Sequence, residues 1–406
     1  MTTLSRRAVL GGVAAASLAR PGLIRAQTVS TPVKIGLLSD VVGLYRENGG
    51  LGSKVAVELA AADFGGALLG RPIEVMQADD QNKPDVASSL AREWIDAEGV
   101  SLLLDGAASS SALAIQQIAR EKKRIYCTTS SVTTALVGKQ CSPYGFQFNG
   151  NAYSLGKGVG GILTEQGYDT WFFITVDYEA GYSLQSNTEQ FIKAAGGKVL
   201  GSVRAPVDTL DFSSYLISAK ASGAKVIGLA NAGADLQNCI KQAAEFGIVK
   251  GGQLLATLVL EIPDVISLGQ DVCQGLVLTN SFYWNMSPQT RAWSERYIAK
   301  MNKPPASGHA CAYSATMHWL KAARAAGTLD ADAVAAKMRQ TPVSDFFNND
   351  VRIMANGAVP HTTYLWMVKP SSEAKGRWDV YKLLGTLPSP TAFPLADALG
   401  CPLVKA

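Results

Sequence analysis

The sequence has few of the residues and motifs that catalysis, metal binding and membrane insertion commonly use. It holds three histidines in 406 residues, and it lacks the HExxH zinc motif, the GxSxG nucleophile elbow and the phosphate-binding P-loop. Its six cysteines lie far apart without a CxxC pair, which argues against a zinc or redox motif. No run of 18 apolar residues occurs, so no transmembrane helix is expected. The sequence therefore predicts no enzyme, no metal site and no cofactor.

The excess of positive charge is confined to the N-terminus. The chain has 37 Lys+Arg and 33 Asp+Glu, a net charge of +4. Residues 1–27 hold four arginines and no acid, with Arg6 and Arg7 ahead of a short apolar run and Ala26 near the end. This pattern is typical of a secretory signal of the twin-arginine type. We expect residues 1–26 to be removed and the protein to reach the periplasm.

Loss of that segment changes what the composition implies. Without the four arginines the chain has 33 basic and 33 acidic residues. A neutral mature chain gives no support for a nucleic-acid partner. In an oxidising compartment some of the six cysteines can pair, and the sequence does not choose among fifteen full pairings.

From residue 33 onward, short apolar strands alternate with helices. One such unit covers residues 33–127 and a second covers about 154–255. This alternation predicts parallel sheets with right-handed crossovers, and hence an α/β fold of two Rossmann-like lobes. The tail lacks this alternation, so we expect it to return to both lobes. Its predicted helices cover 289–301, 308–326 and 331–339, and its predicted strands cover 351–354, 363–368 and 378–383.

Polar loops follow the predicted strands, where open parallel sheets bind ligands. They contain Ser39, Asp40 and Tyr45, Asp79 and Asp80, residues 106–111 and 128–134, Asp177 and Tyr178, residues 231–235, and the stretch near Glu261. The Gly-Ala-Ala-Ser-Ser-Ser loop at 106–111 precedes a helix whose free N–H groups suit a carboxylate. Two interpretations stay open: Ser110 or Ser111 only caps this helix, or the loop also binds an anion.

Four other features have structural interpretations. The GxGxxG match at 156–161 has no strand directly before it, so its glycines indicate close helix packing and not a dinucleotide site. Asp79 and Asp80 are interpreted as caps of the loop before Pro84. The histidines are interpreted as core or surface residues; they are His309, His318 and His361. Glu261 is a candidate to bind a ligand ammonium group, with Asp177 and Asp235 as competitors and a solvated loop acid as the alternative for each.

The order of these motifs resembles the leucine/isoleucine/valine-binding family of periplasmic solute receptors. The resemblance rests on residues 33–39, 79–84, 106–111, 128–134, 177–181 and 282–284. It implies two lobes joined by a three-segment hinge, with crossings near 148–151, 280–284 and 355–361. Lobe 1 would comprise residues 27–148 and 283–355, and lobe 2 residues 149–282 and 356–406.

The resemblance also implies a ligand site between the lobes. Ser109, Ser130 and Thr133 would hold a carboxylate, and Glu261 would hold an ammonium group. The remaining ligand-binding residues would be Tyr45, Tyr178 and Asn231. Two departures from the family pattern are Val132, where a threonine is common, and the missing aromatic near residues 230–231. These departures fit a different carboxylate, such as an aromatic acid.

The function implied is that of a monomeric binding protein of an ABC importer. It would capture a small amino acid of the branched-chain type between closing lobes and deliver it to the permease in the inner membrane. The alternatives are a receptor for an aromatic or other small carboxylate or amide, and a ligand sensor on the same fold. An exported enzyme with a cofactor is a third hypothesis, which the missing catalytic motifs disfavour.

Overall fold

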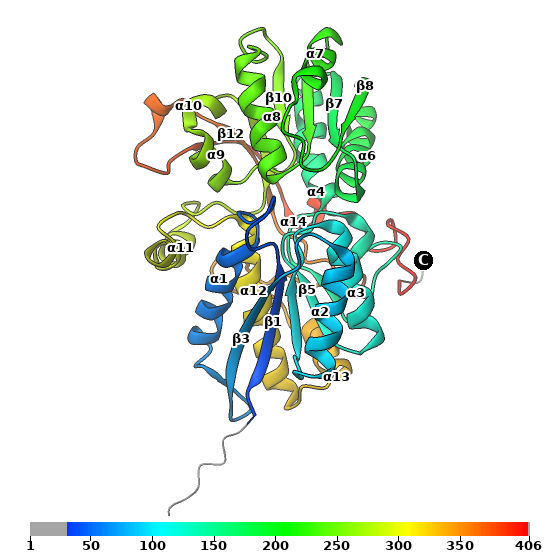
Figure 1. Cartoon of the computed structure of the whole chain (residues 1–406), viewed down its shortest axis with the longest axis vertical. Helices are drawn as coiled ribbons and strands as arrows, with labels where there is room; N and C mark the ends of the chain where they lie inside the picture. Colours follow the sequence, from blue (N-terminus) through cyan, green and yellow to red (C-terminus); the bar gives the residue numbers. More distant parts are fainter. Residues whose placement is uncertain (1–30, 405–406) are drawn as a thin grey trace, which may run out of the picture.

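The protein consists of two α/β lobes with a cleft between them. The computed structural model describes residues 31–404, and Figure 1 shows the lobes one above the other along the long axis. The predicted signal peptide at 1–26 lies outside the described residues. Among the described helices, none combines the length and the apolar character that crossing a membrane requires.

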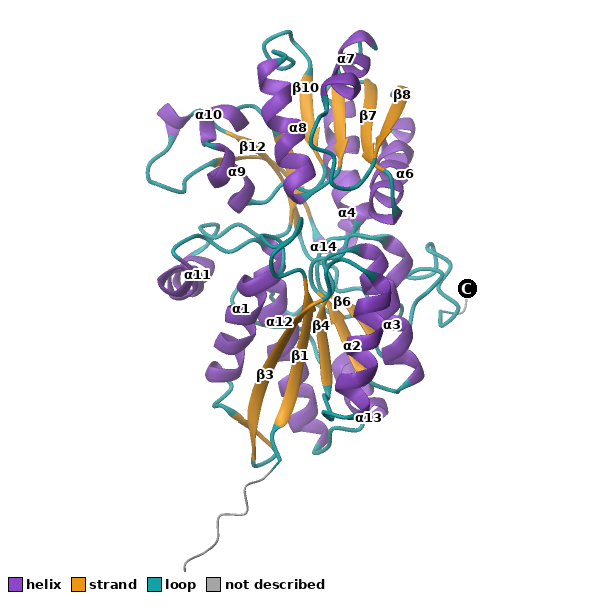
Figure 2. Ribbon diagram, viewed as in Figure 1, coloured by secondary structure: helices purple, strands orange, loops and turns teal. Residues whose placement is uncertain are grey.

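A six-stranded sheet forms the centre of the first lobe, with the strand order β2-β3-β1-β4-β5-β6. All neighbouring strands are parallel except β2, which pairs antiparallel with β3. Helices flank this sheet (Figure 2). The strands are β1 (Val33–Ser39), β2 (Ala67–Leu68), β3 (Arg71–Asp79), β4 (Leu102–Asp105), β5 (Ile125–Thr128) and β6 (Gly145–Gln147). The helices between them are α1 (Gly50–Asp63), α2 (Pro84–Asp96) and α3 (Ser109–Glu121).

A seven-stranded sheet forms the centre of the second lobe, with the order β13-β12-β11-β10-β9-β7-β8. It is parallel from β8 to β11, and the two tail strands join it antiparallel at one edge. The strands are β7 (Thr170–Val176), β8 (Lys198–Ala205), β9 (Val226–Ala230), β10 (Leu254–Thr257), β11 (Val277–Asn280), β12 (Thr363–Val368) and β13 (Tyr381–Leu387). The main helices are α6 (Glu179–Ala194), α7 (Ser213–Ala221), α8 (Gly233–Glu245), α9 (Ile262–Leu268) and α10 (Gln270–Cys273).

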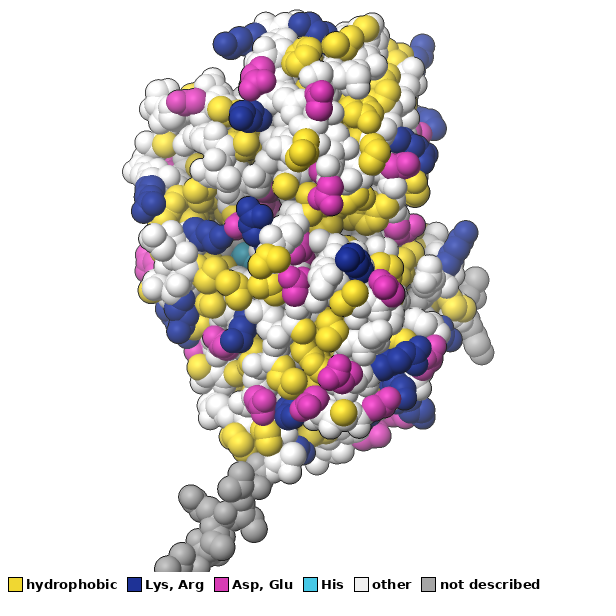
Figure 3. All heavy atoms as spheres, viewed as in Figure 1, with side chains coloured by type: hydrophobic (Ala, Val, Ile, Leu, Met, Phe, Trp, Pro, Cys, Tyr) yellow, Lys and Arg dark blue, Asp and Glu magenta, His cyan; other side chains and the backbone are white. Residues whose placement is uncertain are grey.

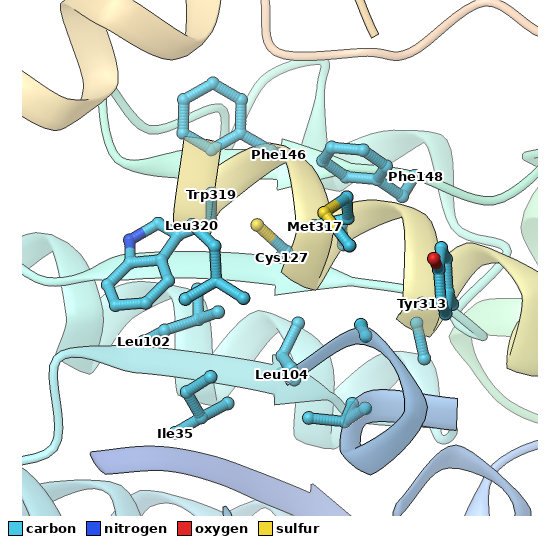
Figure 4. Close-up of a cluster of buried hydrophobic side chains, with 14 of the residues drawn as sticks. Ile35, Leu102, Leu104, Cys127, Phe146, Phe148, Tyr313, Met317, Trp319 and Leu320 are labelled. Carbon is cyan, nitrogen blue, oxygen red and sulfur yellow. The ribbon is translucent and has the colours of Figure 1, made fainter. Parts of the chain in front are cut away.

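The tail returns to both lobes, as predicted. Its helices α11 (Pro288–Met301), α12 (Ser307–Ala326) and α13 (Ala331–Gln340) belong to the first lobe, where α12 packs against α1. Figure 4 shows α12 above the first sheet, with Tyr313 and Met317 near Leu104 and Cys127 of the strands. The predicted strand at 351–354 is wrong, because a single bridge between Val343 and Val351 is all that forms there. The segment lies in the first lobe, where Ile353 packs into the hydrophobic core.

The glycine-rich segment at 156–161 packs closely against the second lobe, which confirms its structural interpretation. Here α4 (Ala152–Gly156) runs through a π-helical turn (Lys157–Gly161) into α5 (Ile162–Glu165). A Cβ atom on Gly156 or Gly160 would lie 2.7 or 2.8 Å from Thr188, and one on Gly158 would lie 2.5 Å from Thr279. Only glycine allows this approach of helix and neighbour.

A disulfide joins Cys141 to Cys401, with their Cα atoms 5.6 Å apart. The other four cysteines are buried free thiols. The bond fastens the chain after β13 to the first lobe, where Ala392 and Phe393 pack against Val137. The lobe boundaries stay a prediction, which we propose to amend by placing residues 388–404 with the first lobe.

Candidate ligand-binding site

Two adjoining hollows lie in the cleft, and both lobes line each of them. The polar lining of the Glu261 hollow includes Asn48, Ser130, Asn149, Glu261 and Ser307. The tyrosine hollow is lined by Tyr45, Tyr178, Asn231 and several apolar residues. Four residues line both hollows, namely Asn48, Ser130, Val132 and Val259. The hollows therefore meet within one cleft that suits a small molecule.

The loop after β1 places Tyr45 in contact with Tyr178 of the second lobe. The carboxylate of Asp40 fixes this loop, because it accepts hydrogen bonds from Gly43 N at 2.5 Å and Tyr45 N at 2.7 Å. The Asn82 side chain donates to the same carboxylate at 2.5 Å. A carboxylate with three donors holds a loop more firmly than a hydroxyl cap can.

The hydroxyls of Tyr45 and Tyr178 meet across the cleft at 2.8 Å. Burial raises the pKa of Tyr178 to about 12 and raises the pKa of Tyr45 well above its usual value. Both phenols therefore stay protonated at neutral pH. Since one hydroxyl hydrogen bridges the two oxygens, the other remains free to donate.

Asn231 follows β9, two positions before α8 begins at Gly233, and lines the tyrosine hollow. Its side chain is 1% exposed, and neither amide atom has a hydrogen-bond partner among residues 31–404. A buried amide without hydrogen-bond partners lowers the stability of the folded state unless a ligand or a water molecule forms those hydrogen bonds. Close by, Ala234 N donates to Leu44 O at 3.2 Å across the cleft.

The three first-lobe hydroxyls of the predicted site have different surroundings. Ser130 lines both hollows and donates to the buried carboxylate of Asp105 at 2.8 Å. Ser109 accepts from the Ser131 hydroxyl at 3.2 Å, and Thr133 donates to Glu179 of the second lobe at 2.6 Å. Neither Ser109 nor Thr133 lines a hollow. Capping of α3 by Ser110 or Ser111 is wrong, since the helix begins at Ser109 after Ala108 without a side-chain cap.

Asp105 accepts the hydrogen bond that holds the Ser130 hydroxyl, and it was not among the predicted site residues. It ends β4 with a φ of 77°, is fully buried, and also accepts from the Thr129 hydroxyl at 3.2 Å. Burial raises its pKa to about 7. Its position at a strand end is the signal that could have identified it.

Glu261 lies between β10 and α9 and reaches across to the first lobe. Its carboxylate accepts from Ser307 N at 3.0 Å and from the Ser307 hydroxyl, at the start of α12. Burial raises the pKa of Glu261 to about 7. Its two competitors line neither hollow: Asp177 accepts from Tyr182 at 2.6 Å, and Asp235 accepts from Asp208 N at 3.2 Å.

Two asparagines in the cleft were not among the predicted site residues. Asn149 lies in the first predicted hinge crossing, and Asn48 follows the Tyr45 loop. The Oδ1 atom of each is buried and has no hydrogen-bond partner in the described part of the chain. The position of Asn149 in a predicted crossing segment between the lobes could have identified it as a site residue.

The interpretation of the histidines as structural residues fits their contacts. His309 bonds to the Tyr297 hydroxyl at 2.9 Å and Gly49 O at 3.0 Å, and burial lowers its pKa to about 4. His318 bonds to Met338 O at 2.9 Å, and His361 bonds to Asn348 at 2.7 Å. None of them lines a hollow of the cleft.

The aspartates after β3 cap their loop, as predicted. Asp79 accepts from Gln81 N at 2.8 Å and Asp80 from Asn82 N at 3.1 Å. Across residues 31–404 no group of three or more His, Cys, Asp or Glu side chains is placed to hold a metal ion.

Two α/β lobes and a cleft lined from both sides define a type I periplasmic binding protein fold. A family model described as periplasmic binding protein matches residues 32–376, so the chain belongs to that family. The curated Leu/Ile/Val-binding protein homolog 6 of Brucella melitensis is 23% identical over 296 residues, which cover 72% of this chain and 75% of that protein. The resemblance noted in the sequence is thereby confirmed.

Solved structures support the same assignment. A periplasmic binding protein from Burkholderia mallei is 45% identical with a TM-score of 0.89, covering 92% of this chain and 100% of that one. A branched chain amino acid ABC transporter periplasmic ligand-binding protein from Burkholderia xenovorans is 38% identical with a TM-score of 0.82, covering 91% and 99%. A solute binding protein from R. palustris in complex with benzoate, 20% identical with a TM-score of 0.81 over 92% and 100%, shares the fold. The family is one of solute-binding proteins.

Proposed function

We propose that the protein is the periplasmic solute-binding component of an ABC importer and captures a small amino acid of the branched-chain type. The observation that carries this proposal is the cleft between the lobes, where Asn48, Asn149 and Asn231 are buried with unpaired amide atoms. A small polar molecule would complete their hydrogen bonds. The similarity to a Burkholderia protein titled as a branched-chain amino acid receptor supports the ligand class.

Binding would be coupled to closure of the lobes. Several contacts already join the lobes across the cleft, among them Tyr45 to Tyr178, Thr133 to Glu179, Ser307 to Glu261 and Ala234 to Leu44. A ligand that touches both lobes stabilises the closed arrangement more than the open one, and so shifts the population toward it. The permease would then bind the closed form and accept the ligand.

The benzoate complex of a relative favours a second candidate ligand class, the small carboxylates without an amino group. The apolar lining from Val132, Leu155 and Leu258 would accommodate either an aliphatic or an aromatic side chain. An amide ligand and a sensor role on the same fold remain further alternatives. We propose that the protein acts as a monomer, because residues of one chain line the cleft from both lobes.

Native mass spectrometry of the exported protein tests the proposal first, because a retained ligand would identify itself by mass. Isothermal titration with amino acids, small carboxylates and amides then measures affinity, and an uptake assay in cells with and without the gene separates transport from sensing. Binding of no small molecule in these three classes would contradict the proposal. Replacement of Arg6 and Arg7 by lysine should retain the precursor in the cytoplasm if the twin-arginine route is used.

A further inference from the structure

The chain leaves the second lobe after β13, at the hinge end of the second sheet. β13 pairs antiparallel with β12, so that its last residue, Leu387, lies opposite Thr363, the first residue of β12. Thr363 comes two positions after the predicted crossing at 355–361. Residues 388–404, which we call the strap, therefore begin beside this crossing.

The strap packs against the first lobe. The side chain of Phe393 is buried in a small apolar cluster with Val137, which lies between β5 and β6 of the first sheet. Ala358 of the predicted crossing belongs to the same cluster. Farther along the strap, Cys401 forms the disulfide with Cys141, which also lies between β5 and β6. The far part of the strap is therefore joined covalently to the first lobe.

Polar contacts join the strap to the predicted crossing and to the second lobe. The Ser389 hydroxyl donates to Pro360 O of the crossing. The Lys157 ammonium group donates to Thr391 O, and Lys157 lies in the π-helical turn between α4 and α5. Figure 1 shows α14 (Ser389–Ala392), the first part of the strap, at the level where the lobes meet. Because β13 belongs to the second sheet and the disulfide lies at the first lobe, the strap connects the lobes in addition to the predicted crossings.

The disulfide determines how firmly the strap is held. The path from Leu387 to Cys401 is 14 residues long, and without the bond nothing covalent would hold Cys401 at the first lobe. In the chain-entropy model, a disulfide that closes a loop of about 15 residues favours the docked strap over the detached strap on the order of 100-fold. Residues 388–404 also include four prolines, whose fixed φ angle limits how far the strap can bend. The bonded strap therefore stays docked.

We propose that the strap is an additional hinge segment, and that the bond between Cys141 and Cys401 restricts how far the lobes open. Hinge segments allow opening by changing φ and ψ at a few residues. A segment that is anchored to both lobes has to change with the others, and the docked strap opposes this change because it also packs on the predicted crossing. A restrained hinge keeps the empty protein nearer to its closed arrangement. A ligand then has to supply less free energy to close the lobes.

Two variants separate restraint of the hinge from general stability. Cys141→Ser/Cys401→Ser removes the bond, so the strap can detach. Insertion of about six glycine and serine residues between Leu387 and Pro388 keeps the bond and the docked strap, because a longer flexible loop costs little stability. The insertion gives the connection from β13 enough slack to remove the restraint.

Small-angle scattering measures the average opening of protein that has been freed of small molecules by dialysis in urea without reductant and then refolded. We expect a larger radius of gyration in both variants than in the wild type. Hydrogen exchange at residues 389–400 should accelerate in the cysteine variant by up to about 100-fold, the factor by which the bond favours docking, and should stay unchanged in the insertion variant. The control carries the same insertion between Gly65 and Gly66, in an exposed turn of the first lobe, and should change neither measurement.

Each possible result decides the proposal. If both variants keep the wild-type radius of gyration, the strap does not restrain the hinge and the proposal is overturned. It is also overturned if only the cysteine variant opens, because a loosened first lobe would then explain the opening. If only the insertion variant opens, the packed strap acts without the bond, and the role of the disulfide is overturned. Should the cysteine variant not fold, the insertion variant decides alone, and none of these measurements depends on the proposed function.

Discussion

Gly233→Ala should impair closure of the cleft without unfolding the second lobe. Gly233 begins α8 with a φ of +59°, and a Cβ atom there would lie 2.2 Å from Leu44 O and 3.0 Å from Tyr45 Cδ1. The three nearest atoms outside its own stretch of chain all belong to Leu44 and Tyr45 of the first lobe. The clash therefore exists when the lobes are together and disappears when they separate.

The size of the effect follows from the contacts that the methyl group displaces. Non-bonded carbon atoms prefer separations of about 3.5–4.0 Å, so the loop at Leu44 has to withdraw by about 1 Å or more. This breaks the bond from Ala234 N to Leu44 O and stretches the bond between Tyr45 and Tyr178. Two hydrogen bonds at about 0.5–1.5 kcal/mol each give about 1–3 kcal/mol. We expect ligand affinity to fall about 5- to 150-fold.

Gly247→Ala is the matched control for this substitution. Gly247 follows the same helix with a φ of +63°, and a Cβ atom there would have no neighbour within 4 Å. Both variants carry the intrinsic cost of alanine in the left-handed region, about 1–2 kcal/mol, so their melting temperatures should fall similarly. Titration calorimetry should show the affinity loss in Gly233→Ala alone, and small-angle scattering should show a more open average shape. Equal affinities in the two variants would refute the closure argument.

Three further predictions concern stability. Burial raises the pKa of Asp105 to about 7, so the folded state binds a proton more tightly than the unfolded chain does. The free energy of unfolding should therefore fall as the pH rises from about 4 through 7. In the Asp105→Asn variant the melting temperature should depend less steeply on pH. An unchanged slope would contradict this. The Cys141→Ser/Cys401→Ser double variant should lose about 2–5 kcal/mol, since the bond closes a separation of 260 residues; a reductant should lower the melting temperature of the wild type to that of the variant and leave the variant unchanged. Gly158→Ala should destabilise by about 1–3 kcal/mol, because its Cβ would lie 2.5 Å from Thr279. Gly161→Ala, whose nearest neighbour would be Phe191 at 3.9 Å, should be neutral in chemical denaturation, and equal losses would argue against close packing.

Most of the fold could be predicted from local pattern. The predicted strand at 363–368 has the observed bounds, and the predicted helix at 308–326 differs from α12 by one residue at its start, because apolar periodicity marks both segments. The strands that were missed, β2, β6 and β11, have two, three and four residues. Strands that short carry too few alternations to be distinguished from loops, and they form because a neighbouring strand offers its free edge.

Surface charge also agrees with the composition of the chain without its four N-terminal arginines. Basic and acidic side chains are interspersed on the face shown in Figure 3, with no large region of one sign. This fits 33 residues of each sign outside residues 1–27. Recognition by this protein therefore depends on the polar groups inside the cleft more than on long-range attraction.

The chemistry of the cleft could be predicted only in part, because it depends on which side chains already have partners. Sequence places Glu261 and Asn231 at strand ends. It does not show that Ser307, 46 positions away, donates a hydrogen bond to Glu261. It also does not show that the Asn231 amide has no hydrogen-bond partner in the described chain. Burial between the lobes raises the pKa of Glu261 to about 7, although the two hydrogen bonds from Ser307 favour the ionised carboxylate, so closure should raise this pKa. A ligand cation in this hollow would hold the carboxylate ionised. Near pH 6 the protein should therefore bind fewer protons when it closes around an amino acid than when it closes without a ligand. This difference couples the charge of the ligand to the closed state of the receptor.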